Sequence, residues 1–135
     1  MADIADKYNI EVDNFMSLIY SGNKVLVYIL LLLIFVDVIT GMVTAFSEGK
    51  LMSKKAMLGY VKKIAFLCVI IVANALDIIF QMHGLLVNAT VMFFIIGEAT
   101  SIVENSVKLG VPIPDQLKSR LNFNEETTKK DEAAK

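Results

Sequence analysis

Apolar and polar residues fall in long blocks along this chain rather than alternating over short distances. Three blocks are predominantly apolar, at about residues 25–46, 56–80 and 85–109. A helix rises about 1.5 Å per residue, so a block of 22 residues such as the first extends about 33 Å and can cross a bilayer. The pattern predicts an all-α membrane protein with three transmembrane helices.

The three blocks differ in how readily each should insert into a membrane. The first is rich in Leu, Ile, Val and Phe, which together outweigh the roughly 3 kcal/mol that Asp37 costs near its centre. The uninterrupted apolar run of the second, residues 64–80, has only 17 residues, so we expect Tyr60 and Val61 to lengthen that helix. The third block carries Glu98 near its middle. We expect it to insert only marginally alone and to need its neighbours or an oligomer.

Polar segments flank this transmembrane region of residues 25–109. Within residues 1–24, Val12, Phe15, Met16 and Ile19 have helical spacing, which predicts a short amphipathic helix. That helix could lie at the membrane interface or fray at the chain terminus. Residues 110–135 form a charged tail, for which we expect a short amphipathic helix at 116–123, and the composition beyond Asn124 is typical of disorder.

Caps, turns and breakers separate the blocks. Ser53 can cap the start of the second helix with its hydroxyl. The connection at residues 81–84 is so short that the third helix must run antiparallel to the second. Gly110, Pro112 and Pro114 end the third helix, because proline cannot continue a helix.

Composition excludes several classes of function. Apolar residues make up 56% of the chain, above the roughly 45–50% of soluble domains, and the net charge is −1. Without a basic stripe, no nucleic-acid partner is expected. Cys68 is the only cysteine, which rules out an intrachain disulfide, and we expect it to be a small buried hydrophobe. His83 is the only histidine and is expected in a solvated turn. We predict no catalytic residues, metal site or cofactor, and therefore not an enzyme.

The lysines predict the orientation. The segment 47–63 carries five Lys, and the chain from Lys108 onward carries six Lys or Arg, whereas the turn at 81–84 has none. The positive-inside rule places the rich segments in the cytoplasm. With three spans both rich segments fall on one side, which predicts the N-terminus outside and the C-terminus inside.

Polar residues within the apolar blocks are costly in a bilayer and are therefore candidates for function. Helical spacing gathers them on one face of each helix. In one interpretation these faces pack together through hydrogen bonds, with Asp37 and Asp77 paired with Lys63 or protonated. In the other they line water in an oligomer. The candidates for lining a pore or controlling assembly are Asp37, Thr40, Gly41, Lys63, Asn74, Asp77, Glu98, Ser101, Glu104 and Asn105.

Several short motifs, in their order and spacing, resemble the toxin-secretion and phage-lysis holin family of Gram-positive phages and clostridia. They span residues 37–121. The pieces are Asp37-Val-Ile-Thr-Gly41, Lys50-Leu-Met-Ser53, Gly59 with Lys62-Lys63, Asp77 at the end of the second block, Glu98 with Ser101-Ile-Val-Glu104-Asn105, and Gly110-Val-Pro112-Ile-Pro114 followed by Leu117 and Leu121. The short turn at 81–84 departs from relatives that carry a longer insertion there.

The resemblance implies a bacteriophage-type holin in the bacterial cytoplasmic membrane. Such proteins form homo-oligomers in the lipid bilayer and open timed lesions, through which an endolysin reaches the cell wall or a large toxin is released. An endolysin or toxin would be coupled by function, without obligate binding. Two alternatives stay open from the residues alone: a small ion- or proton-conducting transporter subunit, and a membrane antiholin or scaffold.

Overall fold

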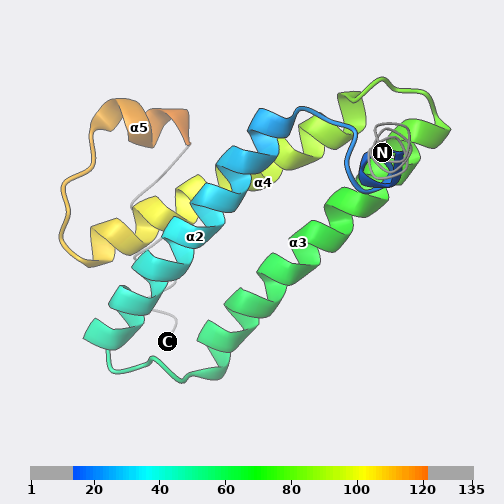
Figure 1. Ribbon diagram of the computed structural model, residues 1–135. Coiled ribbons are helices and arrows are strands. Elements are labelled where there is room, and N and C mark those ends of the chain that lie inside the picture. Colours follow the sequence, from blue (N-terminus) through cyan, green and yellow to red (C-terminus); the bar gives the residue numbers. More distant parts are fainter. Residues whose placement is uncertain (1–13, 122–135) are drawn as a thin grey trace, which may run out of the picture.

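A computed structural model describes residues 14–121 of the 135-residue chain, and every regular element within that range is a helix (Figure 1). Residues 14–19 are helical. They are followed by α2 (Lys24–Ser47), α3 (Lys54–Ile79), α4 (Leu85–Lys108) and the short α5 (Asp115–Arg120). Helices α2, α3 and α4 are each long and apolar enough to cross a membrane. The expectation of an all-α protein with three transmembrane helices is confirmed.

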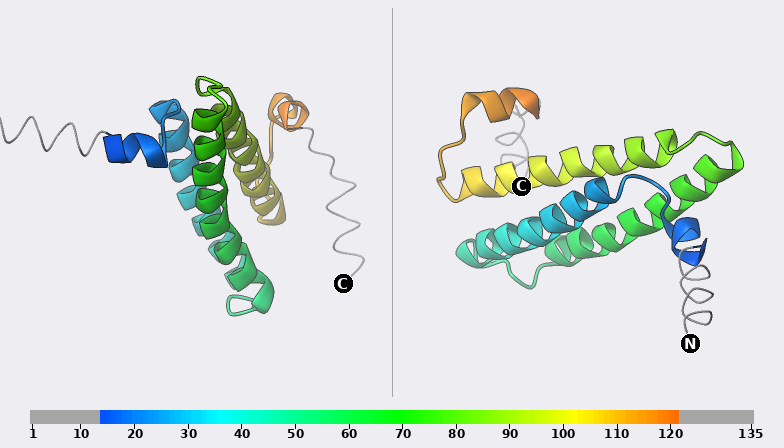
Figure 2. Two further views of the ribbon diagram at one scale, coloured as in Figure 1. Left: turned by 90° about the vertical axis from the view of Figure 1, so that its right-hand side faces the viewer. Right: turned by 45° about the horizontal axis from the view of Figure 1, so that its top comes forward.

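Neighbouring long helices run antiparallel: in the view of Figure 1, α2 descends, α3 rises and α4 descends again, and Figure 2 shows the same three helices from two further sides. The lysine-containing connection between α2 and α3 is at the same end as the close of α4. We call this the inner end. The beginning of α2 and the tight turn between α3 and α4 are at the opposite end, which we call the outer end.

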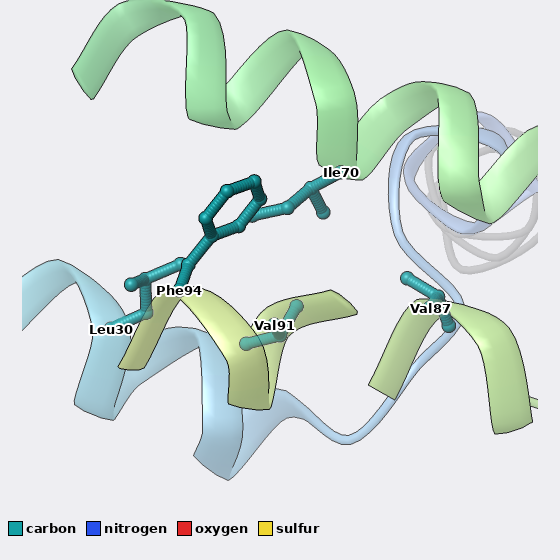
Figure 3. Packing of buried hydrophobic residues seen from close by; sticks show 5 residues of the cluster. All are labelled: Leu30, Ile70, Val87, Val91 and Phe94. Atoms are coloured by element: carbon teal, nitrogen blue, oxygen red, sulfur yellow. The ribbon is translucent and has the colours of Figure 1, made fainter. Parts of the chain in front are cut away.

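Helix α4 holds the bundle together. It packs extensively on α2 and also on α3, whereas α2 and α3 make few contacts with each other. Its apolar residues Val87, Val91 and Phe94 form a core with Leu30 and Ile70 (Figure 3). In α4, 28% of the most apolar stretch is buried, against 11% in α2 and in α3. The least apolar span is therefore the one that the protein itself covers best, as its marginal hydrophobicity requires.

Side chains and glycine define the helix ends. Asn23 caps α2 by accepting from the Val25 N–H at 2.9 Å. Ser53 caps α3 as expected, since its hydroxyl oxygen accepts from the Ala56 N–H at 3.2 Å. Helix α4 ends at Lys108, and Gly110 follows shortly after it with a φ of +81°, which favours glycine and lets the Val111 N–H reach the Ser106 carbonyl.

Some expectations are corrected and others fall outside the described range. Cys68 is exposed, not buried, because it lies on the outward side of α3. Gln81 lies in the turn that follows α3, which ends at Ile79. His83 is exposed in that turn, as expected. Val12 and the tail beyond Asn124 lie outside the described residues.

Candidate functional site

A charged cluster joins the three spans near their middle. The Lys63 ammonium of α3 lies 2.7 Å from a carboxylate oxygen of Asp37 in α2. The same ammonium donates to both carboxylate oxygens of Glu98 in α4, at 2.8 and 2.6 Å. Each helix therefore contributes one charged side chain, and a single lysine bridges the other two.

The cluster is buried and its charges do not cancel. Asp37 and Glu98 are 6% and 3% exposed. An isolated carboxylate in such surroundings is very costly, but a close ion pair with additional hydrogen bonds offsets much of that cost. One lysine facing two carboxylates leaves a formal charge of −1 on the cluster. The arrangement is compatible with a bilayer only while Lys63 stays between its two partners.

Hydrogen bonds from α4 to α2 continue the cluster toward the inner end. The Asn105 amide donates to the free carboxylate oxygen of Asp37 at 3.2 Å and to the Thr40 hydroxyl at 3.3 Å. The Thr44 hydroxyl lies 2.8 Å from the Thr40 carbonyl and 3.4 Å from that of Asn105. Gly41 packs beside the Asn105 amide, and a Cβ there would be 3.6 Å from its nitrogen.

A cavity of about 400 Å³ opens beside this cluster, between α2, α3 and α4. Both carboxylates and Lys63 line it, so the buried charges lie at the wall of an accessible space. Three glycines and two further lysines also form the wall. These residues, together with one serine and one asparagine of α4, are Gly41, Lys55, Gly59, Lys62, Gly97, Ser101 and Asn105.

Asp77 is bonded quite differently, at the outer end. Its carboxylate accepts from the backbone N–H groups of Gly84, Leu86 and Val87 at 2.7, 2.7 and 3.1 Å. These are the unpaired donors at the start of α4, where the helix dipole also favours an anion. Asp77 thereby stabilises the tight turn, in which Gln81 and His83 adopt positive φ angles of 53° and 54°.

The possible pairing of Asp77 with Lys63 is not found, for a simple geometric reason. The two residues lie on the same helix, and fourteen residues separate them by about 21 Å. Glu98 takes the second place beside Lys63 instead. The packing interpretation is otherwise realised within this single chain, since no buried side-chain nitrogen or oxygen of residues 14–121 lacks a hydrogen-bond partner.

Asn74 holds the segment that precedes α2. It is fully buried, and its amide donates to the carbonyls of Ser17 and Leu18 at 3.1 and 2.9 Å. Its oxygen accepts from both the backbone N–H and the hydroxyl of Ser21, each at 2.8 Å. Asn74 and Asp77 are thus at the outer end, away from the charged cluster.

Comparison with known proteins decides the family. A model of the bacteriophage holin family matches residues 14–125. The chain belongs to that family. A protein of Bacillus phage phi105 described as a probable holin is 41% identical over 110 residues, which cover 78% of this chain and 82% of the phage protein.

Bacterial relatives extend this similarity. YqxH of Bacillus subtilis is 38% identical over 109 residues, covering 79% of this chain and 78% of that protein. A 14.9 kDa protein encoded beside nagH in Clostridium perfringens is 39% identical over 99 residues, covering 68% and 70%. No solved structure matches the chain.

Membership of the holin family confirms the resemblance drawn from the sequence motifs. Together with the three apolar helices, it makes this a multi-pass membrane protein, and it points to a pore-forming, non-enzymatic activity. Of the ten candidate residues, the structure gathers Asp37, Thr40, Gly41, Lys63, Glu98, Ser101 and Asn105 around one cavity or beside it. It places Asn74 and Asp77 elsewhere, and Glu104 one turn after Ser101 on the partly buried side of α4.

Sequence reasoning missed some participants. Asn88 accepts from the Asn23 N–H at 2.8 Å, so α4 as well as α3 binds the chain entering α2. Its signal was available, since it is an amide in an apolar run and such residues are costly in a bilayer. Lys55 and Lys62 also line the cavity and were not among the candidates, because the sequence places them only in a lysine-rich segment.

Proposed function

We propose that this chain has the activity of a holin: it oligomerises in the bacterial cytoplasmic membrane and opens timed lesions there. An endolysin, or a large toxin, would cross the membrane through such lesions. Family membership supports this function most directly. The observation that carries the mechanism is the Asp37–Lys63–Glu98 cluster, which is internally paired and yet lies at the wall of a cavity.

The cluster explains how one chain can occupy two states. In the single-chain bundle Lys63 is paired with both carboxylates, so the protein can accumulate in the bilayer without opening it. In an assembly, Lys63 can exchange an internal partner for a carboxylate of another copy. The carboxylate left over from each copy then faces water in the lesion. Because assembly depends on concentration, accumulation itself sets the time of opening.

The orientation belongs to the same proposal. Lys50, Lys55 and Lys62 lie toward the inner end, together with Lys108 at the close of α4. By the positive-inside rule, this end faces the cytoplasm and the outer end faces away from it. Endolysin or toxin needs no binding site on the chain, because a lesion large enough for folded proteins is not selective.

The experiment is expression in a bacterium that also holds a cytoplasmic reporter enzyme and a matching endolysin. We expect abrupt release of the folded reporter after a delay, and lysis only when the endolysin is present. A Lys63→Met variant, expressed to the same membrane level, should lose that sharp delay. Expression that leaves cells intact would instead indicate an antiholin or scaffold and would contradict the proposal.

The same cavity also favours a second candidate, a small ion- or proton-conducting subunit, because carboxylates beside an intramembrane cavity suit ion coupling. The two functions differ in the size of what crosses. A conducting subunit would release potassium ions and collapse the membrane potential while the reporter enzyme stays inside. Release of the reporter together with potassium supports the holin.

A further inference from the structure

The helical residues 14–19 lie across the bundle rather than along it. The left-hand view of Figure 2 shows this segment, in dark blue, crossing the direction of α2–α4. Asn74 fixes its end, since the amide donates to the Ser17 and Leu18 carbonyls. These carbonyls belong to the last turn of the helix and have no partner within it. Asn74 therefore acts as a cap supplied by another helix.

Hydrogen bonds also fix the link from this segment to α2, at residues 20–23. The Tyr20 hydroxyl donates to the Asn23 carbonyl at 2.8 Å, and burial raises the pKa of Tyr20, which keeps that donor protonated. The Asn23 N–H donates to Asn88. A Cβ on Gly22 would be 2.5 Å from the Asn88 side-chain oxygen, so the close approach requires glycine. Helices α3 and α4 thus both hold residues 14–23 in one orientation.

The attachment point sets the depth of the segment in the membrane. Asn74 precedes the last residue of α3, Ile79, by five positions, or about 7 Å along the helix axis. Interfacial helices bury their apolar face about 5–10 Å into the boundary between headgroups and acyl chains. With the end of α3 taken as the membrane boundary, the segment lies at the depth of an interfacial helix, and it also has the crosswise direction of one.

The exposed surface of the segment suits that location. Phe15, Met16 and Leu18 are 63%, 54% and 62% exposed, whereas Ile19 and Tyr20 turn inward to line an apolar cavity of about 240 Å³ between α2 and α3. Residues 14–23 contain no charged side chain. Attraction to anionic headgroups is thus not involved for these residues, and the free apolar side chains match lipid at the boundary.

We propose that residues 14–19 form a lipid-binding surface that anchors the outer end of the bundle in the membrane interface, with Asn74 holding the segment at that depth. The partner is the headgroup–acyl boundary of the bilayer, whatever the headgroup charge. This inference is independent of lesion formation, because it concerns the single-chain bundle.

The test uses the full chain in vesicles of zwitterionic phospholipid, with Cys68→Ala and Phe15→Cys so that one thiol carries an environment-sensitive dye. Bromines placed near the headgroup should quench the dye strongly, bromines near the acyl-chain ends should quench it weakly, and aqueous iodide should have little effect. Adding anionic lipid should leave these results unchanged. Asn74→Leu, which keeps α3 apolar, should reduce the shallow quenching at least about twofold and increase quenching by iodide.

Thr100→Val is the matched control, because Thr100 is a polar residue of α4 whose hydroxyl bonds only its own helix, to the Ile96 carbonyl. It should leave the quenching unchanged. Ser21→Ala removes one bond to Asn74 and should give a smaller change in the same direction, which keeps the test informative if Asn74→Leu misfolds. A dye quenched by iodide but not by either bromolipid would overturn the proposal. So would crosslinking of the labelled position to a second copy without lipid quenching.

Discussion

Asp77 and Glu98 are both carboxylates buried in the bundle, at 2% and 3% exposure, but the regions around them differ. At the outer end, Asp77 accepts only from backbone N–H groups of the turn and α4. At the centre, Glu98 bonds a lysine side chain that also binds a third helix. The first region is satisfied by its own local fold, whereas the second depends on charges from three separate helices.

This difference indicates which region can rearrange. The backbone donors at the start of a helix remain in place as long as the helix does, so the hydrogen bonds of Asp77 should persist on assembly. A side-chain ion pair beside a cavity of about 400 Å³ can exchange partners when another copy approaches. We therefore expect the outer end to act as a fixed frame and the charged centre to act as the part that changes on assembly.

Loss of the lysine should have the largest effect. Lys63→Met leaves Asp37 and Glu98 buried without their cation, a change that typically costs about 3–5 kcal/mol. We expect the free energy of unfolding, measured by titration with denaturing detergent, to fall by about that amount. The triple variant with Lys63→Met, Asp37→Asn and Glu98→Gln should recover most of it, because no charge remains buried. A single variant within about 0.5 kcal/mol of the parent would show that the pairing is not needed.

Loss of the outer cap should be the next largest effect. Asp77→Ala leaves three backbone N–H groups at the start of α4 without an acceptor, and a lost cap costs about 0.5–2 kcal/mol. The same detergent titration measures this loss. Asp77→Asn keeps one acceptor oxygen, so its free energy of unfolding should lie between those of the parent and Asp77→Ala. Once folded protein is present at equal amounts, lysis timing should be unchanged, and a large shift would mean that the frame also takes part in opening.

Neutralising one carboxylate should give a moderate effect of opposite sign. Glu98→Gln leaves Lys63 paired with Asp37 alone, so the formal charge of the cluster changes from −1 to zero. The single-chain bundle becomes more compatible with the bilayer, and lysis in an inducible assay should be delayed. Each kcal/mol by which the single-chain bundle is stabilised changes the equilibrium between that bundle and the assembly about fivefold. Asp37→Asn should act in the same direction, and earlier lysis with both variants would refute the charge argument.

The smallest effect on the single chain should come from Gly59→Ala. A Cβ at Gly59 meets nothing within 4 Å, although the residue lines the central cavity. We expect the free energy of unfolding to rise by no more than about 1 kcal/mol, because alanine favours the helix more than glycine does. Gly22→Ala, at the outer end, should destabilise instead, since its Cβ would collide with Asn88 and Tyr20. Equal changes in the free energy of unfolding for both variants would contradict the contrast between free space at the centre and close packing at the outer end.

The sequence predicts the spans well, because long apolar blocks and the breakers between them determine where helices begin and end. The Ser53 cap and the stop at Gly110 follow from local chemistry and are found in the structure. Helical spacing also identifies a polar face on each span. It does not reveal which face meets which, because that depends on how the helices cross.

The site shows this limit residue by residue. Asp37, Asp77 and Glu98 have the same signature in the sequence, a carboxylate within an apolar run. Only the packing of α4 on the other helices shows that Glu98 pairs with Lys63, whereas Asp77 caps the start of α4. Asn74 likewise reads as one more polar residue of a face, although it binds the segment at residues 17–21. Such partners are distant in sequence, and no periodicity encodes them.

The most direct test of a changing centre within a fixed frame is the reaction of single thiols in intact membranes. Asp37→Cys, Glu98→Cys and Asp77→Cys would each be made in the Cys68→Ala background and treated with a charged, membrane-impermeant reagent before and after lysis begins. We expect positions 37 and 98 to react only after onset, while position 77 stays protected throughout. Protection of all three positions after onset, or reaction of position 77 alone, would contradict a changing centre within a fixed frame.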